Sequence, residues 1–70
     1  MDILIFKTNT AGKKQKKKLF PLLRKIEGII RWNIDLEDSD RVLRVVALHV
    51  SPQTVENTLT QAGYYCKEME

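Results

Sequence analysis

The densest chemical signal in this sequence is a run of cations, with five lysines among the six residues from Lys13 to Lys18. Thr10 and the small Gly12 come just before it, where a helix is expected to begin. Free N–H groups at a helix start, together with several ammonium groups, can receive a phosphate or a carboxylate. In the alternative interpretation the lysines form a solvated helix face, and acids in the turn 37–40 offset their positive charge. The sequence leaves both open.

The other reactive side chains do not form a catalytic set. Cys66 and His49 are the only residues of their types. They are expected on different strands, with Cys66 as a small buried hydrophobe and His49 on the sheet face away from the helices. Asp38 and Asp40 supply too few oxygens, at the wrong spacing, for a cation loop. We therefore predict a protein that is not an enzyme, with no catalytic residue and no cofactor.

Charge is divided unevenly along the chain. Residues 1–35 carry nine Lys and Arg against three acids, and residues 36–70 carry three against six. A protein that binds nucleic acid over its whole surface would spread its positive charge more widely. The two halves have opposite charge, so a monomer or a weak head-to-tail dimer is expected.

Length and composition predict one domain, residues 1–70, because a chain this short cannot form two cores. No apolar run approaches the ~18–20 residues that span a bilayer, and the first residues lack the basic segment of a signal peptide. A single cysteine favours a reducing compartment. A cytoplasmic protein without a membrane partner is the expectation.

Hydrophobic periodicity predicts a strand and then a helix in the first part of the chain. The apolar run 3–6 is typical of a central strand buried on much of both faces. Gly28 is expected to close the helix that follows. Pro21 leaves two alternatives: a helix from about Ala11 to Glu27 kinked near Pro21, which we favour, or a firm helix that begins only around Lys18. The apolar stripe of this helix comprises Leu19, Leu22, Leu23 and Ile26.

The second part of the chain predicts two strands, a helix and a last strand. Residues 30–37 alternate between apolar and polar, which indicates a half-buried strand, and residues 42–50 form the next strand after a turn. Ser51 and Pro52 are typical of a helix start, and Gly63 of a helix end. Residues 64–69 are long enough for a final strand. The apolar stripe of the second helix comprises Val55, Leu59 and Ala62.

The predicted order of elements is β-α-β-β-α-β. Right-handed crossovers then place the first and third strands in the centre of the sheet and both helices on one face. The expected fold is a ferredoxin-like α/β (α+β) sandwich with a four-stranded antiparallel sheet.

Three segments between residues 23 and 64 resemble the heavy-metal-associated domain, the family of small copper chaperones and of modules at the N-termini of metal-pumping ATPases. These are mostly core and turn positions, so the resemblance implies the same ferredoxin-like fold. The segments are Leu23-x-x-Ile26-Glu27-Gly28-Ile29, Trp32-x-Ile34-Asp35-Leu36-Glu37 and Val55-x-x-x-Leu59-x-x-Ala62-Gly63-Tyr64.

The metal motif of that family, Met-x-Cys-x-x-Cys, has no counterpart here. Counting back from Gly28 places Thr10 at the methionine position, Gly12 at the first cysteine and Gln15 at the second. A glycine and an amide supply neither the charge nor the softness that Cu(I) needs. The resemblance therefore implies a degenerate site without metal ligands. Tyr64 matches a loop position that lies near the metal in the family.

These observations favour a small binding module that engages an acidic protein partner or an anion through the start of the first helix. One alternative is copper or zinc binding inherited from the family, with ligands from a dimer or from Cys66. Another is single-stranded nucleic-acid binding by the lysines, Trp32 and the open sheet face. The residues predicted for the partner or anion are Thr10, Gly12, Lys13, Lys14, Lys17 and Tyr64.

Overall fold

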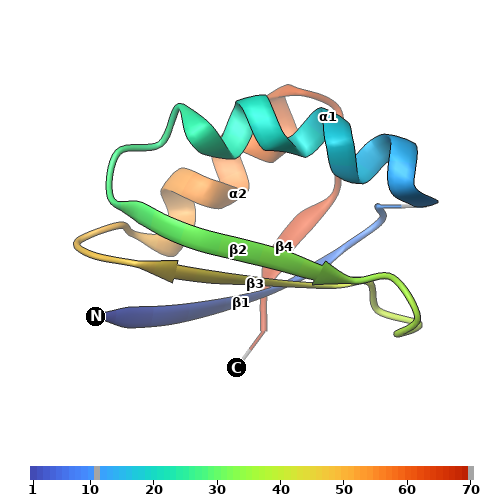
Figure 1. The fold of residues 1–70 in the computed structure, drawn as a ribbon, viewed down its shortest axis with the longest axis horizontal. Coiled ribbons are helices and arrows are strands. Elements are labelled where there is room, and N and C mark those ends of the chain that lie inside the picture. Colours follow the sequence, from blue (N-terminus) through green and yellow to red (C-terminus); the bar gives the residue numbers. More distant parts are fainter. Residues whose placement is uncertain (11, 70) are drawn as a thin grey trace.

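Two helices cover one face of a four-stranded antiparallel sheet whose strand order is β2-β3-β1-β4 (Figure 1). The computed structural model describes residues 1–10 and 12–69. The predicted ferredoxin-like sandwich, with β1 and β3 in the centre, is confirmed. The elements are β1 (Asp2–Thr8), α1 (Gly12–Arg24), β2 (Ile29–Asp35), β3 (Val42–Ala47), α2 (Pro52–Gln61) and β4 (Cys66–Glu68).

The core lies between the sheet and the two helices. Phe6 of β1 is paired with Leu43 of β3, and both are fully buried. Burying an apolar side chain of this size contributes about 1.5–3 kcal/mol, so this layer holds the helices to the sheet. The helices supply Leu19 and Leu23 from α1, and Val55 and Leu59 from α2.

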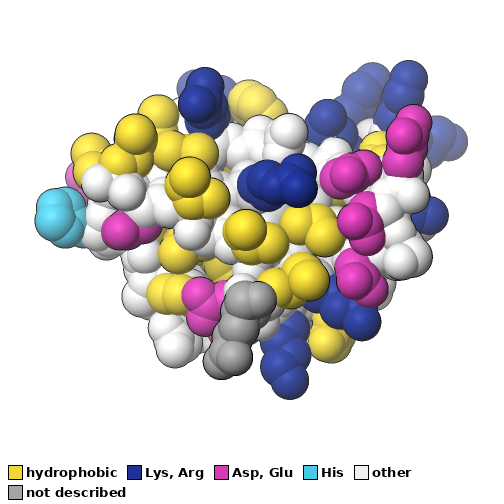
Figure 2. All heavy atoms as spheres, turned by 90° about the horizontal axis from the view of Figure 1, so that it is seen from below, with side chains coloured by type: hydrophobic (Ala, Val, Ile, Leu, Met, Phe, Trp, Pro, Cys, Tyr) yellow, Lys and Arg dark blue, Asp and Glu magenta, His cyan; other side chains and the backbone are white. Residues whose placement is uncertain are grey.

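The opposite face of the sheet is open, and Figure 2 shows apolar side chains spread across it, with acids gathered along one edge. Ile3 is 67% exposed and Ile5 is half-buried. The run forms a central strand, as predicted, but the prediction that it is buried on much of both faces is wrong. Alternate residues of a strand point to opposite faces, and the helices cover only one of them.

Helix α1 begins at Gly12 and runs through the lysines and Pro21 to Arg24. The interpretation in which the lysines are helical is confirmed, but the helix ends three residues before the predicted Glu27. Pro21 cannot donate to the carbonyl of Lys17, and both residues lie on the exposed side of the helix, where water can reach that carbonyl. A kink at Pro21 stays a prediction.

Gly28 allows the start of β2 to approach the end of β3 closely. It does not end α1, so its predicted role is corrected. Its φ is +102°, and its carbonyl accepts a hydrogen bond from Leu48 N at 2.9 Å. A β-carbon on Gly28 would lie 2.5 Å from the carbonyl oxygen of Leu48 and 2.7 Å from Cγ2 of Val50. Only glycine allows the chain to approach β3 this closely.

A bulge interrupts the pairing of β2 with β3 between Ile29 and Arg31. The extra residue, Ile30, is 54% exposed, so the predicted alternation fails at this position. Trp32 and Ile34 keep the expected inward side and pack on the core.

The second helix begins and ends as predicted. Ser51 Oγ accepts from Thr54 N at 3.3 Å, Pro52 takes the first helical position, and Gly63 follows the helix with a φ of +92°. Ala62 is exposed instead of core, because the helix ends at Gln61. No helix among residues 1–10 and 12–69 is long and apolar enough to cross a membrane.

The predictions for His49 and Cys66 have different outcomes. His49 lies in the turn after β3 with a φ of +59°, so its predicted place on a strand is wrong. Cys66 is buried in the core, as predicted for a small hydrophobe.

Candidate functional site

The end of β1 is fastened to the turn between β2 and β3. Thr8 N donates to the carbonyl of Asp40 at 3.1 Å, and Thr8 Oγ1 donates to the carbonyl of Arg41 at 2.7 Å. Lys7 Nζ lies 3.3 Å from a carboxylate oxygen of Asp40. These contacts fix the direction in which the chain leaves the sheet toward α1.

Thr10 takes part in the hydrogen bonds that hold the end of β1, and it is not exposed at the surface. It is fully buried, its N–H donates to Thr8 Oγ1 at 3.2 Å, and the two hydroxyl oxygens lie 3.2 Å apart. A residue with no exposed atoms cannot touch a partner, so the predicted contact of Thr10 with a ligand is corrected to a structural role.

A second connection joins this loop to the C-terminal part of the chain. Asn9 Oδ1 accepts from Tyr65 N at 2.9 Å. Tyr64, the predicted neighbour of the site, is half-buried against the core, and its N–H donates to the carbonyl of Leu59. The loop is thus held on two sides before α1 begins.

Gly12 opens α1 with a φ of +81°, and no atom lies within 4 Å of the place where its β-carbon would be. The conformation, and not crowding, explains glycine here. Lys13 and Lys14 follow on the exposed surface.

Helix α1 carries two different stripes. One stripe is buried through Leu19 and Leu23. The other is cationic and aromatic, with spacings of three and four residues that keep its members on one side of the helix. This second stripe comprises Lys13, Lys16, Lys17, Phe20 and Arg24.

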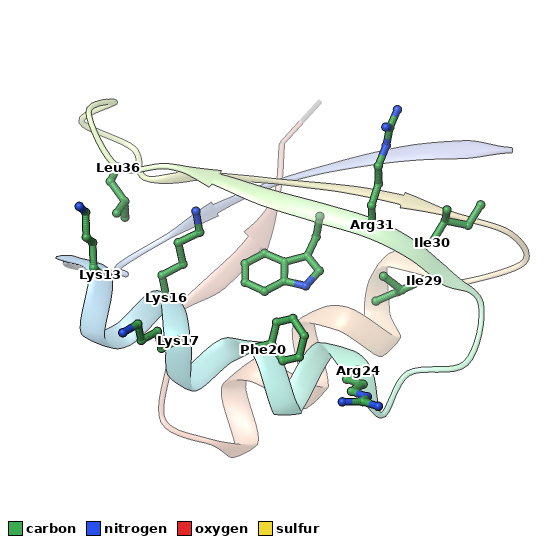
Figure 3. A pocket seen from close by; sticks show the side chains of 10 residues that line it. Lys13, Lys16, Lys17, Phe20, Arg24, Ile29, Ile30, Arg31 and Leu36 are labelled. Atoms are coloured by element: carbon green, nitrogen blue, oxygen red, sulfur yellow. The ribbon is translucent and has the colours of Figure 1, made fainter.

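The second stripe forms one wall of a groove of about 930 Å³ between α1 and β2 (Figure 3). Phe20 is 54% exposed and points from α1 toward β2. Its ring centroid lies 6.4 Å from that of Trp32, with the ring planes tilted by 53°, a favourable arrangement for an aromatic pair. The apolar lining comprises Phe20, Ile29, Ile30, Trp32 and Leu36.

The charged side chains that line the groove have one sign. Its lining includes five cations and no acid among the described residues. The only salt bridge in the described part of the chain is that between Lys7 and Asp40. The acids of the turn 37–40 therefore form no ion pair with the lysines of α1, and these cations are left for solvent or a partner. Four of them lie on α1, namely Lys13, Lys16, Lys17 and Arg24; the fifth, Arg31 of β2, points to the side of the sheet opposite Phe20 (Figure 3).

Trp32 lies on the helix side of the sheet, against Phe20 and the core. The nucleic-acid alternative needs Trp32 and the open sheet face on one surface. The structure separates them, because that face is on the other side of the sheet.

The described residues do not fit a metal ion. Burial raises the pKa of the Cys66 thiol to about 12, and the nearby Glu56 contributes to the rise. Cysteine binds metal as a thiolate, which this environment disfavours. No three His, Cys, Asp or Glu side chains of residues 1–10 and 12–69 are grouped to hold an ion.

A site shared by Cys66 and His49 is also excluded by the register of the sheet. Cys66 pairs with Thr8 at one end of β1, whereas Ala47, just before His49, pairs with Asp2 at the other. Asp2 and Thr8 are six residue steps apart along β1, a distance of about 20 Å.

The raised pKa of Cys66 predicts that folding stability falls in alkaline solution. An unfolded chain loses this proton near the ordinary pKa of 9.0, whereas the folded chain keeps it to about 12. The folded state therefore binds more protons over this range, so the stabilisation is complete below about pH 9 and is lost as the pH rises toward 12.

Urea unfolding near pH 7 and near pH 10.5 measures this effect, with Cys66→Ala as the control. The difference in unfolding free energy between the two chains is expected to shrink at the higher pH. Parallel changes in both chains would show that another group is responsible.

Sequence reasoning placed Lys13, Lys14 and Lys17 together, and the structure brings Lys13 and Lys17 to the groove but not Lys14. Lys16 belongs to the lysine run that the sequence singles out, whereas the sequence pattern does not predict Phe20, Arg24 and Arg31 as members of the same surface. One feature of the sequence does indicate this surface. Phe20 is an aromatic residue that lies outside the buried stripe of α1 and among its cations.

Comparison with known proteins shows the fold. No family model matches the sequence, and no curated protein matches it. Oxidised MerP from Ralstonia metallidurans CH34 superposes with a TM-score of 0.83 at 15% identity, covering 99% of this chain and 97% of that one.

Two further solved structures agree. The yeast copper transporter domain CCC2A, solved in apo and Cu(I)-loaded states, has a TM-score of 0.81 at 14% identity, with coverage of 97% and 94%. The N-terminal domain of ZntA in its Zn(II) form has a TM-score of 0.80 at 19% identity, with coverage of 97% and 92%. The predicted resemblance in fold to heavy-metal-associated domains is confirmed.

Proposed function

We propose that this protein is a non-enzymatic docking module that binds an acidic protein partner in the groove between α1 and β2. The observation that carries the proposal is the composition of the groove, which combines an apolar floor with four cations along α1 and no acid among the described residues; a fifth cation, Arg31 of β2, contributes to the lining but points to the other side of the sheet. A partner that presents carboxylates around apolar side chains would match both features.

The cations are suited to attracting such a partner. None of the five forms a salt bridge within the described chain, so binding breaks no internal ion pair. Exposed charges act mainly on the rate of encounter and are screened by salt beyond about 10 Å at 0.1 M. The proposal keeps the predicted electrostatic docking through lysines of the first helix. It assigns the main contacts to Lys16 and Lys17.

The aromatic pair supplies the anchor that charges alone do not. Interfaces draw most of their affinity from a few buried aromatic and arginine contacts, and exposed ion pairs contribute little each. Phe20 and Trp32 are already packed together, so a partner side chain would meet an ordered surface. Gly12, Lys14 and Tyr64 do not line the groove, so a contact of these three residues with a partner stays a prediction outside this proposal.

Metal binding is the alternative that the likeness to MerP, CCC2A and ZntA favours. No ligand set is grouped for it among residues 1–10 and 12–69, Cys66 is buried, and the count back from Gly28 places Gly12 and Gln15 where the resembling family has its cysteines. Stoichiometric Cu(I) binding under reducing conditions would revive this alternative. A cytoplasmic location stays a prediction.

The proposal is tested with a synthetic probe peptide of about ten residues in which aspartate and glutamate alternate with leucine. Trp32, the only tryptophan, reports binding through its fluorescence. We expect saturable binding that weakens at least about tenfold between low and high salt. A control peptide with serine in place of leucine should bind markedly more weakly. No saturable change in Trp32 emission at low salt would overturn the proposal.

A further inference from the structure

The geometry points to one binding mode: we infer that the acidic segment binds in extended conformation, as a fifth strand added to β2. This inference rests on the proposed function, because it assigns the backbone conformation of the partner in the same groove. It specifies the partner as an acidic strand and not as an acidic helix.

The first observation is that β2 is an edge strand. In the order β2-β3-β1-β4, only β3 pairs with it, so its outer side has no strand neighbour in the described chain. Unpaired N–H and C=O groups along an edge are a template for another extended chain.

The second observation is that the groove follows this edge. Its β2 wall is formed by the consecutive residues 29–32, and its other wall is the second stripe of α1 (Figure 3). A strand placed beside β2 would therefore lie along the mouth of the groove. Every second side chain of that strand would enter it, toward Phe20 and Trp32.

The third observation concerns the other face of the added strand. Figure 3 shows Arg31 projecting from β2 to the side of the sheet opposite Phe20. An extended segment sends alternate side chains to both sides, and here each side offers cations: Lys16 and Lys17 over the groove, and Arg31 across the sheet. A helix in the groove could reach the lysines but would leave Arg31 without a partner.

The bulge sets the limit of the pairing. The ladder of β2 with β3 is regular from Arg31 to Asp35 and shifts between Ile29 and Arg31. Bulges at sheet edges commonly terminate pairing. The added strand is thus expected to pair along residues 31–35, with the exposed Ile30 as an apolar contact at its end. Asp35 is the single acid on this edge, so the partner position beside it should be neutral.

The test uses two backbone-methylated versions of the probe peptide, one with N-methyl groups at odd positions and one at even positions. A strand has one edge toward β2, so methylation of the parity that faces β2 removes the hydrogen bonds and adds a clash. That version is expected to bind roughly 10- to 100-fold more weakly, and the other about as well as the unmodified peptide. Hydrogen exchange should show new protection in residues 31–35.

The outcomes separate the two proposals. Equal binding or equal loss for the two versions, without new protection of residues 31–35, would overturn strand addition while docking in the groove stands. Failure of the unmodified peptide to bind would overturn both. A preference for one parity together with protected amides supports the fifth strand.

Discussion

A chain in which Lys16 and Lys17 are both replaced by glutamate is expected to bind the probe peptide roughly 10- to 100-fold more weakly than the unaltered protein. Both lysines line the groove, and each reversal replaces an attraction by a repulsion. An exposed ion pair contributes about 0.2–1 kcal/mol, so two reversals remove about 1–3 kcal/mol in total. The loss should be largest at low salt and should shrink as salt screens the charges.

The same helix provides a matched control. Lys14 and Lys18 are exposed on α1 but do not line the groove. The replacements Lys14→Glu and Lys18→Glu together alter the net charge by the same amount, so they reproduce any general effect of charge. Binding is expected to change by less than about threefold. An equal loss in both double variants would show that the peptide senses overall charge, and the assignment to the groove would be wrong.

Gly28→Ala is expected to destabilise the fold by about 3 kcal/mol or more, a large part of the ~4–10 kcal/mol expected for a chain of this size. Two costs combine. The φ of +102° is unfavourable for any residue with a β-carbon, and that carbon would lie 2.5 Å from the carbonyl oxygen of Leu48. Relief would require β2 and β3 to separate where Leu48 N bonds to the Gly28 carbonyl.

The variant Gly63→Ala separates the cost of the left-handed backbone from the cost of the close contact. Gly63 has a similar φ of +92°, but no atom lies within 4 Å of its virtual β-carbon. This variant is expected to lose only about 1–2 kcal/mol, from the backbone conformation alone. The measurement is the urea midpoint of both variants with an unchanged slope. Similar losses for Gly28→Ala and Gly63→Ala would show that the close approach to Leu48 has no energetic weight.

The sequence predicted the fold because local patterns and the handedness of crossovers agree. The apolar stripe containing Leu19 and Leu23, the capping pair Ser51–Pro52 and the order of elements each limit the topology. Once the order is β-α-β-β-α-β, few arrangements bury those stripes. These features are encoded by neighbours in sequence, so one chain is enough to read them.

The errors concern features that only the assembled sheet creates. Ile3 is as apolar as Leu4, and nothing local indicates which side of β1 the helices cover. The role of Gly28 depends on the end of β3, twenty residues later. Thr10 is a polar residue expected at an accessible helix start, and only the folded loop shows that it is buried with its N–H and hydroxyl against Thr8 Oγ1.

The groove shows the same limit for function. The charges of α1 were evident, but the surface on which they act depends on β2 lying beside the helix. Phe20 and Trp32 are twelve residues apart in sequence and meet only because a helix crosses over an edge strand. Individual charges were therefore predictable, whereas the binding surface was not.

The left-handed backbone at Gly12 makes the introduction of a thiolate pair at the start of α1 a problem of conformation as well as of side chains. Cysteine at this position would carry a β-carbon at a φ of +81°, a conformation that costs L residues roughly 1–2 kcal/mol. A cysteine at Gln15 alone would supply only half of a soft-ion pair. Building a pair of thiolates at the start of α1 would thus require a changed backbone at residue 12 as well as two new side chains.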